Sequence, residues 1–211
     1  MRIKDFAGLP TLFVMAAEAE YGPHLRARIT PLMTGIGPVE AAVQLTKALA
    51  ALPKRPALIV SLGSAGSRNL KQTQVYQVSS VSWRDMDASA LGFEKGRTPL
   101  LDLPAEVALP ITIPNLPSAR LSTGANVVSG PAYDDIDAEM VDMETWAHLR
   151  TAQTFDIPLI GLRGISDGEK DLSGLQDWTA LLGQIDQNLA QALDLVEEAI
   201  RQNIISIPRS E

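Results

Sequence analysis

The chain is organised around one stretch, Pro158-Leu159-Ile160-Gly161-Leu162-Arg163-Gly164-Ile165-Ser166-Asp167. Its first half is an apolar run with the length and composition of a buried β-strand. The run ends in an arginine, a serine and an aspartate, beside glycines that allow tight turns. Because ligands of open α/β sheets bind outside the carboxyl ends of the strands, these side chains predict an active site at that edge. The alternative interpretation is an arginine–aspartate pair that only caps the strand.

Apolar strands and helices alternate on both sides of this stretch. Strands are predicted over residues 11–16, 28–34, 56–62, 75–83 and 120–124, and helices over 39–52, 135–154 and 182–200. In the helix over 135–154 an inner face is expected from the spacing of Ile136, Met140, Met143 and Ala147. The proline-rich residues 91–117 predict an extended excursion with short strands. The alternation predicts one domain over residues 1–211, a three-layer α/β/α fold with a central mixed, largely parallel sheet.

Composition excludes several classes of function. A net charge of −7 argues against sequence-independent nucleic-acid binding, which requires Lys and Arg to neutralise phosphates. The chain has no cysteine and only two histidines, His24 and His148, so we expect no metal site. No apolar run reaches membrane-spanning length and the start does not resemble a secretory signal, so a cytoplasmic protein without membrane contact is expected.

Other predicted strands also end in polar or small residues. The first brings Glu18 and Glu20 to its end, the second leads into Gly35-Ile36-Gly37-Pro38, and the third into Gly63-Ser64-Ala65-Gly66. Glycines at a helix start let a ligand approach backbone N–H groups, although a turn alone also explains them. The phosphate-loop, dinucleotide-binding and serine-hydrolase motifs are all missing, so those activities lose their main support.

Several of these motifs follow one order along the chain. They are Met15-Ala16-Ala17-Glu18-Ala19-Glu20, Gly35-Ile36-Gly37-Pro38-Val39-Glu40-Ala41-Ala42, Leu62-Gly63-Ser64-Ala65-Gly66, Ser122-Thr123-Gly124, Val141-Asp142-Met143-Glu144 and Arg163-Gly164-Ile165-Ser166-Asp167. In this order, over nearly the whole chain, they resemble the purine nucleoside phosphorylase superfamily and most closely its 5′-methylthioadenosine/S-adenosylhomocysteine nucleosidase branch. The resemblance implies a nucleoside phosphorylase-like fold and an N-glycosyl hydrolase that acts in methionine salvage. Its products would be free base and 5-substituted ribose.

The resemblance also implies roles for individual residues. Asp167 matches the acid that protonates the purine at N7, assisted by Ser166. Glu20 and Arg163 match the pair that positions the attacking water. Breaking an N-glycosidic bond builds positive charge on the ribose and negative charge on the base, so an acid at the base and carboxylates at the sugar act where charge develops.

Further positions match the substrate pocket of that branch. Glu144 matches the carboxylate that binds the ribose hydroxyls, Met143 packs beneath the sugar, and Ser64 lines the water pocket. Val127 and Val128 lie in the loop that contacts the base. The resemblance implies no cofactor.

A dimer is also implied. Residues 83–93 resemble the dimer-forming stretch of that branch, and the apolar, helix-poor segment Ala88–Pro99 would be hard for a monomer to cover. We expect a homodimer in which this segment, with Phe93, lies near the neighbour's 5′ pocket. Leu91, Phe93 and Leu175 would then meet an apolar 5′ group, which favours methylthioadenosine over adenosine. Asp167 can also accept a hydrogen bond from an exocyclic amine, which favours a 6-aminopurine base.

Two departures from the pattern keep alternatives open. The segment between Glu20 and Gly35 is short, which leaves Glu18 as an alternative to Glu20. Val127 stands where that branch usually has an aromatic side chain, which allows a different base, as in the related futalosine hydrolases. A phosphorylase using Arg26 and Arg28 is a second enzymatic hypothesis, and a catalytically silent nucleoside-binding protein is a third.

Overall fold

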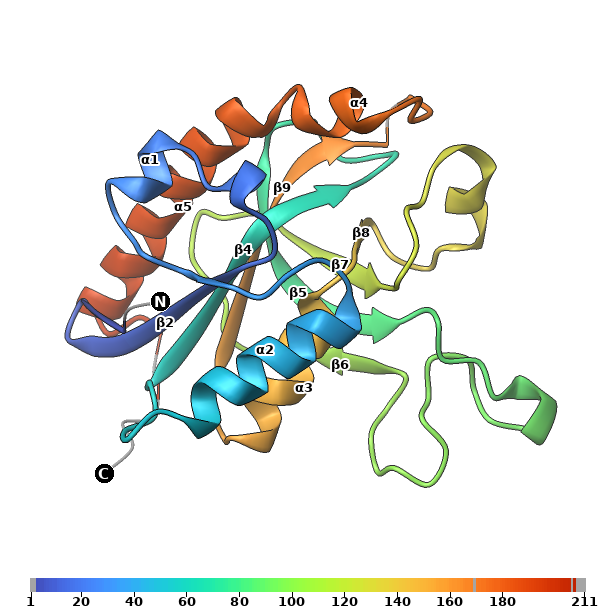
Figure 1. Ribbon diagram of the computed structural model, residues 1–211, viewed down its shortest axis with the longest axis horizontal. Helices are drawn as coiled ribbons and strands as arrows, with labels where there is room; N and C mark the ends of the chain where they lie inside the picture. The colour runs from blue at the N-terminus through green and yellow to red at the C-terminus, as the bar shows by residue number, and fades with distance from the viewer. Residues whose placement is uncertain (1–2, 169, 206, 208–211) are drawn as a thin grey trace.

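In the part of the chain that the structure describes, nine β-strands pair into one mixed sheet with helices on both faces (Figure 1). The computed structural model describes residues 3–168, 170–205 and 207. The strands are β1 (Lys4–Phe6), β2 (Leu9–Met15), β3 (Leu32–Met33), β4 (Leu58–Gly66), β5 (Val75–Trp83), β6 (Glu106–Ala108), β7 (Ser118–Thr123), β8 (Met140–Asp142) and β9 (Leu159–Asp167). The helices are α1 (Pro23–Arg26), α2 (Pro38–Ala50), α3 (Thr145–Thr154), α4 (Leu175–Thr179) and α5 (Leu182–Arg201), with 3₁₀ turns η1 (Glu18–Glu20), η2 (Ser89–Leu91) and η3 (Gly130–Asp135). The predicted α/β class with a central mixed sheet is confirmed.

Five of the strands form a closed ring of pairs. β4 pairs with β9, β9 with β5, β5 with β7, β7 with β8, and β8 returns to β4. β2 extends the sheet from β4 in parallel, with Thr11 opposite Leu58. Because β2, β4 and β9 are parallel neighbours, their carboxyl ends meet at one edge of the sheet.

Two hydrophobic cores hold the sheet between its helices. Along β2, Phe13 and Met15 belong to the core beneath α5, whereas Leu12 and Val14 belong to the core beneath α2 and α3. This two-sided burial explains why the predicted strands read as continuous apolar runs. Burying one such large side chain contributes roughly 1.5–3 kcal/mol. None of the described helices has the length and hydropathy to cross a membrane.

The predicted helix over residues 135–154 is wrong in its first half. That half contains the end of η3 and the strand β8, which pairs with both β4 and β7. The helix α3 begins only at Thr145, where Asp142 accepts a hydrogen bond from the Thr145 backbone N–H at 3.0 Å. The helical spacing of Ile136, Met140 and Met143 was therefore coincidental, because strand pairing overrides local periodicity there.

The predicted strand over residues 28–34 is wrong in length. Only Leu32–Met33 pairs with β2, because the N–H groups of Arg28 and Ile29 bond to the Leu25 carbonyl at the end of α1. Pro31, which has no N–H, precedes the pairing. The short α1 is the single helix between η1 and β3 in the described chain.

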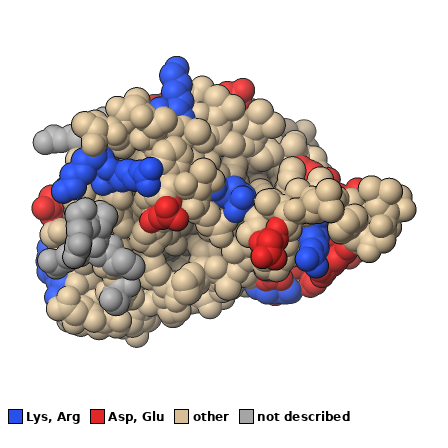
Figure 2. All heavy atoms as spheres, turned by 90° about the horizontal axis from the view of Figure 1, so that it is seen from below, with Lys and Arg blue, Asp and Glu red and all other residues tan. Residues whose placement is uncertain are grey.

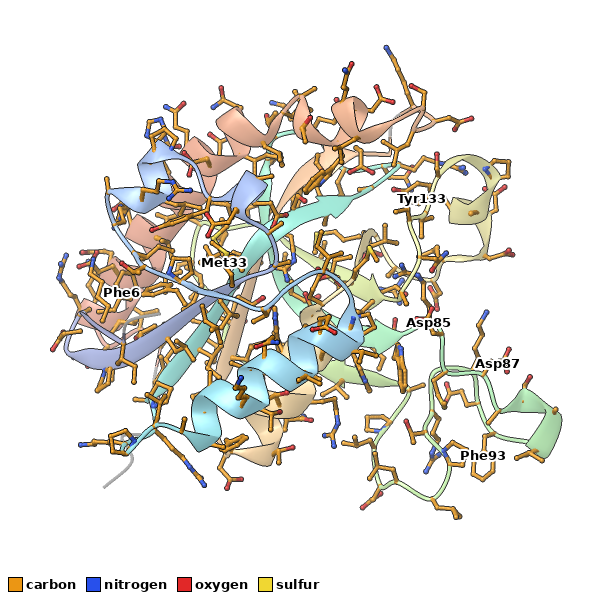
Figure 3. The ribbon with its side chains drawn as sticks, in the orientation of Figure 1. Phe6, Met33, Asp85, Asp87, Phe93 and Tyr133 are labelled. Carbon is orange, nitrogen blue, oxygen red and sulfur yellow. The ribbon has the colours of Figure 1, made fainter. Side chains whose placement is uncertain are left out.

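Residues 84–105, which we call the arm, leave the sheet after β5 and project from its side (Figure 1, green). The arm contains η2 and is followed by the short β6, as the proline-rich composition predicts. Its Leu91 and Leu100 are 76% and 98% exposed. Figure 3 shows Asp87 and Phe93 on the arm, well away from the sheet.

Candidate active site

A cavity of about 560 Å³ lies at the edge where β2, β4 and β9 end. It is lined by most of the residues that the sequence predicts for the site: Glu20, Ser64, Val127, Val128, Met143, Glu144 and Asp167. A larger, open hollow of about 850 Å³ separates the arm from residues 126–137. The predicted acid, base and ribose carboxylates line the smaller cavity, so that one is the candidate site.

Asp167 is the last residue of β9 and reaches the cavity through a β-bulge. Ala65 pairs with Ile165 but Gly66 pairs with Asp167, so Ser166 is an extra residue on β9. Bulges re-aim side chains beside functional sites. The Ser166 hydroxyl donates a hydrogen bond to Asp167 Oδ1. Burial raises the pKa of Asp167, and the hydrogen bond from Ser166 lowers it in part, so the net shift suits an acid that must hold a proton.

Glu20 comes from η1 and is buried at the other side of the cavity. Its Oε1 accepts hydrogen bonds from the Ser64 backbone N–H at 2.7 Å and from the Ser64 hydroxyl at 2.6 Å. Its Oε2 is buried without a hydrogen-bond partner in the described part of the chain. Burial raises the pKa of Glu20, while Ser64 and then Arg163 lower it. Glu18, the alternative to Glu20, pairs with Arg26 on the surface instead.

Two glycines of β4 make room for these carboxyl groups. A Cβ at Gly63 would lie 3.3 Å from both carboxyl oxygens of Glu20. A Cβ at Gly66 would lie 3.0 Å from Asp167 Oδ2 and 2.4 Å from the Tyr133 hydroxyl oxygen. The small-residue motif after the third predicted strand therefore lets the predicted acid, Asp167, and the predicted base, Glu20, approach one strand.

Glu144 immediately precedes α3, and its side chain faces the start of α2. Its Oε1 accepts a hydrogen bond from the Gly37 backbone N–H at 2.9 Å. Gly37 has φ +94°, a conformation that a residue with a Cβ adopts only with strain. Burial, and then the charge of Asp142, raises the pKa of Glu144 to about 8, against the lowering effect of Gly37. Met143 lines the cavity beside it.

Arg163 lies beneath the cavity and does not line it. Its Nη2 forms a buried ion pair with Asp142 Oδ2 at 3.1 Å, with the two side chains 2% and 1% exposed. It also donates to the Thr145 hydroxyl at 2.6 Å and the Ser61 hydroxyl at 3.0 Å. The structure thus places Arg163 as a charge behind Glu20, in direct contact with Asp142. Its predicted part in holding water stays a prediction.

A buried histidine supports this arginine. The Nδ1 of His148 lies 3.0 Å from the Ser61 hydroxyl, and its Nε2 lies 3.0 Å from the Thr34 hydroxyl. Burial, and then Arg163, lowers the pKa of His148 to about 3, so the ring is neutral. A neutral ring can accept at one nitrogen and donate at the other, which fits two hydroxyl partners. His148 belongs to the scaffold under the site.

The loop after β7 forms the side where a base would lie. Arg84 donates to the Asn126 carbonyl at 2.7 Å, and Asp85 accepts from the Ala125 N–H at 2.6 Å. A Cβ at Gly124 would lie 2.5 Å from Arg84 Nε, so a larger residue there would displace the Arg84 side chain. Beyond it, Val128 is buried and Val127 is 66% exposed at the cavity mouth.

Phe93 is not brought to this cavity. It lies on the arm, and Figure 3 shows it far from Tyr133, which lies on the loop that carries η3. Leu175, the other apolar residue expected near the 5′ group, does line the cavity. Within one chain, therefore, only Leu175 of that expected set reaches the site.

Sequence reasoning missed two aromatic residues of the site. Trp178 on α4 lines the cavity and donates its indole N–H to the Ser64 hydroxyl oxygen at 2.9 Å. Tyr133 has a buried hydroxyl beside Asp167, without a hydrogen-bond partner in the described residues. Neither residue follows an apolar strand, so the strand-end rule could not find them.

Comparison with known proteins finds this chain similar to nucleosidases. No protein-family model matches the chain. A 5′-methylthioadenosine/S-adenosylhomocysteine nucleosidase of Haemophilus influenzae strain PittEE is 31% identical over 155 residues, covering 65% of this chain and 67% of that protein.

Solved structures share the fold. A putative 5′-methylthioadenosine/S-adenosylhomocysteine nucleosidase of Borrelia burgdorferi bound to adenine superposes with a TM-score of 0.74 at 20% identity, covering 89% of this chain and 99% of that chain. A futalosine hydrolase mutant of Helicobacter pylori superposes with a TM-score of 0.73 at 20% identity, covering 89% of this chain and 98% of that chain.

Proposed function

The chain belongs to the 5′-methylthioadenosine/S-adenosylhomocysteine nucleosidase family, and from this premise we propose that its cavity binds and cleaves the purine nucleosides of that family. The protein is a nucleosidase, an N-glycosyl hydrolase that releases free base and 5-substituted ribose. Methylthioadenosine and S-adenosylhomocysteine-type nucleosides are its expected substrates. The observation that carries the assignment of residues is the buried Oε2 of Glu20, which has no hydrogen-bond partner among the described residues, in a side chain that lines the same cavity as Asp167.

In the proposed reaction each carboxyl group acts where charge develops. Asp167 donates a proton to N7 of the base as the glycosidic bond breaks, and the pKa raised by burial keeps that proton available. The Oε2 of Glu20 accepts a proton from the water that attacks the ribose. Glu144 binds the ribose hydroxyls. Negative charge near the sugar stabilises the positive charge of the transition state.

The same charges favour water over phosphate as the nucleophile. A phosphate dianion beside Glu20 would meet a carboxylate at short range. The two arginines that could have formed an anion site are engaged elsewhere: Arg26 pairs with Glu18, and Arg28 pairs with Asp194 and Glu197 against α5. We therefore place hydrolysis before phosphorolysis.

Product analysis tests this function. The protein is incubated with methylthioadenosine, S-adenosylhomocysteine, adenosine, inosine and futalosine, with and without phosphate, and the products are separated by chromatography. We expect adenine and free methylthioribose from methylthioadenosine, at a rate that phosphate does not change. A sugar 1-phosphate would establish the phosphorylase instead, and a bound but uncleaved nucleoside would establish a binding protein.

Futalosine hydrolysis is the second candidate, favoured by one feature of the base loop. The exposed Val127 offers the base less stacking surface than an aromatic ring. A preference for futalosine over methylthioadenosine in the same panel would replace the substrate and leave the hydrolase intact.

We also propose that the protein is a homodimer. The arm carries Leu91 at its projecting end, and the mouth of the cavity exposes Ile36, Val127 and Leu175. Figure 2 shows an uncharged tip on the projecting end, with charged side chains behind it, and an uncharged tip suits burial against another chain. In a dimer the arm of one chain would complete the 5′ side of its neighbour's cavity. Light scattering that gives the mass of a single chain at micromolar concentration would contradict this proposal.

The cellular role proposed here is methionine salvage in the cytoplasm, where methylthioadenosine cleavage would release the sulfur-bearing sugar for reuse. Cells that lack the protein should then accumulate methylthioadenosine, and unchanged levels would contradict the role.

A further inference from the structure

Trp178 ties the short helix α4 to the catalytic centre. Its indole Nε1 lies 2.9 Å from the Ser64 hydroxyl oxygen. The same segment of chain contributes Leu172, Ser173 and Leu175 to the cavity wall. The Trp178 side chain therefore links this wall of the cavity to Ser64, which contacts Glu20.

The directions of these hydrogen bonds follow from the chemistry of the donors. An indole N–H can only donate, so the Ser64 hydroxyl oxygen must accept from Trp178. A serine hydroxyl has one hydrogen, and its other close partner is Glu20 Oε1 at 2.6 Å. The hydroxyl hydrogen therefore points to Glu20, in a relay from Trp178 through Ser64 to the carboxylate.

This relay makes the two oxygens of Glu20 unequal. Oε1 accepts both the hydroxyl and the backbone N–H of Ser64, whereas Oε2 has no partner among the described residues. We propose that Trp178 is a positioning residue for the hydrolytic base, holding the Ser64 hydroxyl toward Oε1 so that Oε2 is left to take the proton of water. The proposal rests on the proposed function, because it assigns Trp178 a part in that reaction.

Other charged groups around Glu20 are independent of this relay. Arg163 of β9 lowers the pKa of Glu20 from beneath the cavity. Glu144 lies near enough to be coupled to it by charge repulsion. Asp186 of α5 accepts hydrogen bonds from the N–H groups of Gly22, His24 and Leu25, just after η1. Replacing the indole N–H leaves all three in place.

The Trp178→Phe variant removes the N–H and keeps an aromatic ring. The Ser64 hydroxyl is then free to turn away from Glu20 for part of the time. Because its hydrogen bond lowers the pKa of Glu20, the pKa rises, and the acidic limb of kcat/KM moves to higher pH. One hydrogen bond corresponds to a shift of about half to one pH unit.

The experiment is a double-mutant cycle read out as the pH profile of kcat/KM for methylthioadenosine. Wild type, Trp178→Phe, Ser64→Ala and the double variant are compared. We expect Trp178→Phe to move the acidic limb in the wild-type background and not in the Ser64→Ala background, because the relay passes through that hydroxyl. Trp83→Phe is the matched control, since the Trp83 indole N–H has no partner in the described chain. Its acidic limb should stay at the wild-type pH.

An acidic limb that stays in place in Trp178→Phe, or that moves equally with and without the Ser64 hydroxyl, overturns the role of Trp178. Trp178→Leu, which also removes the indole N–H, is measured in parallel, and circular dichroism checks that each variant is folded. The test needs only one of the two variants to fold. If wild type itself releases no base, the proposed function fails. Wild-type hydrolysis with an unmoved limb rejects only the positioning role.

Discussion

At the scale of single residues, four carboxylate residues line one cavity, Glu20, Asp142, Glu144 and Asp167, and Asp142 is paired with the buried guanidinium of Arg163. Burial is the largest cause of the raised pKa of Glu20, Glu144 and Asp167. Their hydrogen bonds then divide the roles. Asp167 has the single donor Ser166, whereas one oxygen of Glu20 has two donors and the other has none in the described chain. In the proposed reaction, similar groups thereby serve as an acid and a base.

We predict that Asp167→Asn abolishes most turnover and leaves the fold intact. The amide fills the same space but cannot give a proton to N7, so kcat should fall by about 10²–10⁴-fold while KM changes little. Release of adenine from methylthioadenosine measures this. Asp137→Asn, at a side chain that is 94% exposed, is the matched control and should retain wild-type turnover. Near-wild-type turnover in Asp167→Asn would refute the assignment of the acid.

A second residue-scale prediction concerns Glu144 and pH. Its pKa is about 8 in the folded protein, against an ordinary value of 4.5. Between these values the folded state binds more protons than the unfolded state, so the contribution of Glu144 is present below about pH 4.5 and is lost as pH rises through about 8. We expect Glu144 to lower the free energy of unfolding as pH rises over this range, against an opposite contribution below about pH 6.5 from His148, whose pKa is lowered to about 3.

Glu144→Gln cannot titrate, so its free energy of unfolding should decline less steeply over the same range. Some slope should persist, because Glu20 and Asp167 also have raised pKa values. Urea unfolding at pH 5, 6.5 and 8 measures the difference. Parallel curves for wild type and Glu144→Gln would show that burial does not shift this carboxyl group.

Residues at strand ends were within reach of sequence reasoning, and residues on loops were not. Glu20 and Asp167 follow apolar runs, and the carboxyl ends of parallel neighbours must meet. Trp178 lines the cavity from α4, and the Tyr133 hydroxyl lies behind Gly66 beside Asp167 from η3, so neither follows directly from a predicted strand. The contact of Arg163 with Asp142 was missed because β8, which carries Asp142, was interpreted as part of a helix.

At the scale of elements, the site depends on close packing of β9 against α5. Gly164 of β9 lies under Ile185 of α5, so closely that a Cβ there would lie 2.5 Å from Ile185 Cγ2. Gly164 sits next to Arg163, three residues before Asp167. Any displacement of β9 by α5 therefore reaches the acid.

We predict that Gly164→Ala destabilises the protein by about 1–3 kcal/mol, because it overpacks a filled core. Gly183 is the matched control within α5, since a Cβ there meets no atom within 4 Å. Gly183→Ala should be neutral or stabilising by up to about 1 kcal/mol, because alanine favours a helix over glycine. Urea unfolding of the two variants measures the contrast. Equal stabilities would show that β9 and α5 separate without cost.

Strands and helices were predictable where the apolar pattern of their own sequence matches the face that they bury. β5 begins and ends where its apolar composition predicts, and α5 follows its apolar stripe. β8 is three residues long and carries no pattern of its own. It exists because β4 and β7 supply backbone partners on either side.

At the scale of the whole molecule, the described chain leaves its site open on one side. The arm turns away from its own cavity and carries apolar residues into solvent (Figure 1). Across the cavity mouth, Ile36 and Leu175 are 56% and 72% exposed. In a symmetric dimer, the apolar arm of each chain would cover the apolar cavity mouth of the other chain.

We therefore predict that Leu91→Asp weakens the dimer and alters specificity together. A carboxylate at the end of the arm would be buried against the neighbour's cavity without a partner, which opposes association. The 5′ methylthio group of methylthioadenosine would lose its apolar contacts with the neighbouring arm. Adenosine has a 5′ hydroxyl that does not depend on these contacts. We expect a monomer at micromolar concentration by light scattering, and a several-fold smaller preference for methylthioadenosine over adenosine in kcat/KM.

Ile204→Asp is the matched control for the arm variant, because Ile204 is also exposed, at 53%, but follows α5 at the opposite end of the molecule. It should remain a dimer with the wild-type preference. A Leu91→Asp protein that stays dimeric and keeps its preference would place the interface elsewhere. A variant that becomes monomeric yet keeps its preference would show that each cavity is complete without its neighbour. Loss of the neighbouring arm would then leave the binding of the thioether unchanged.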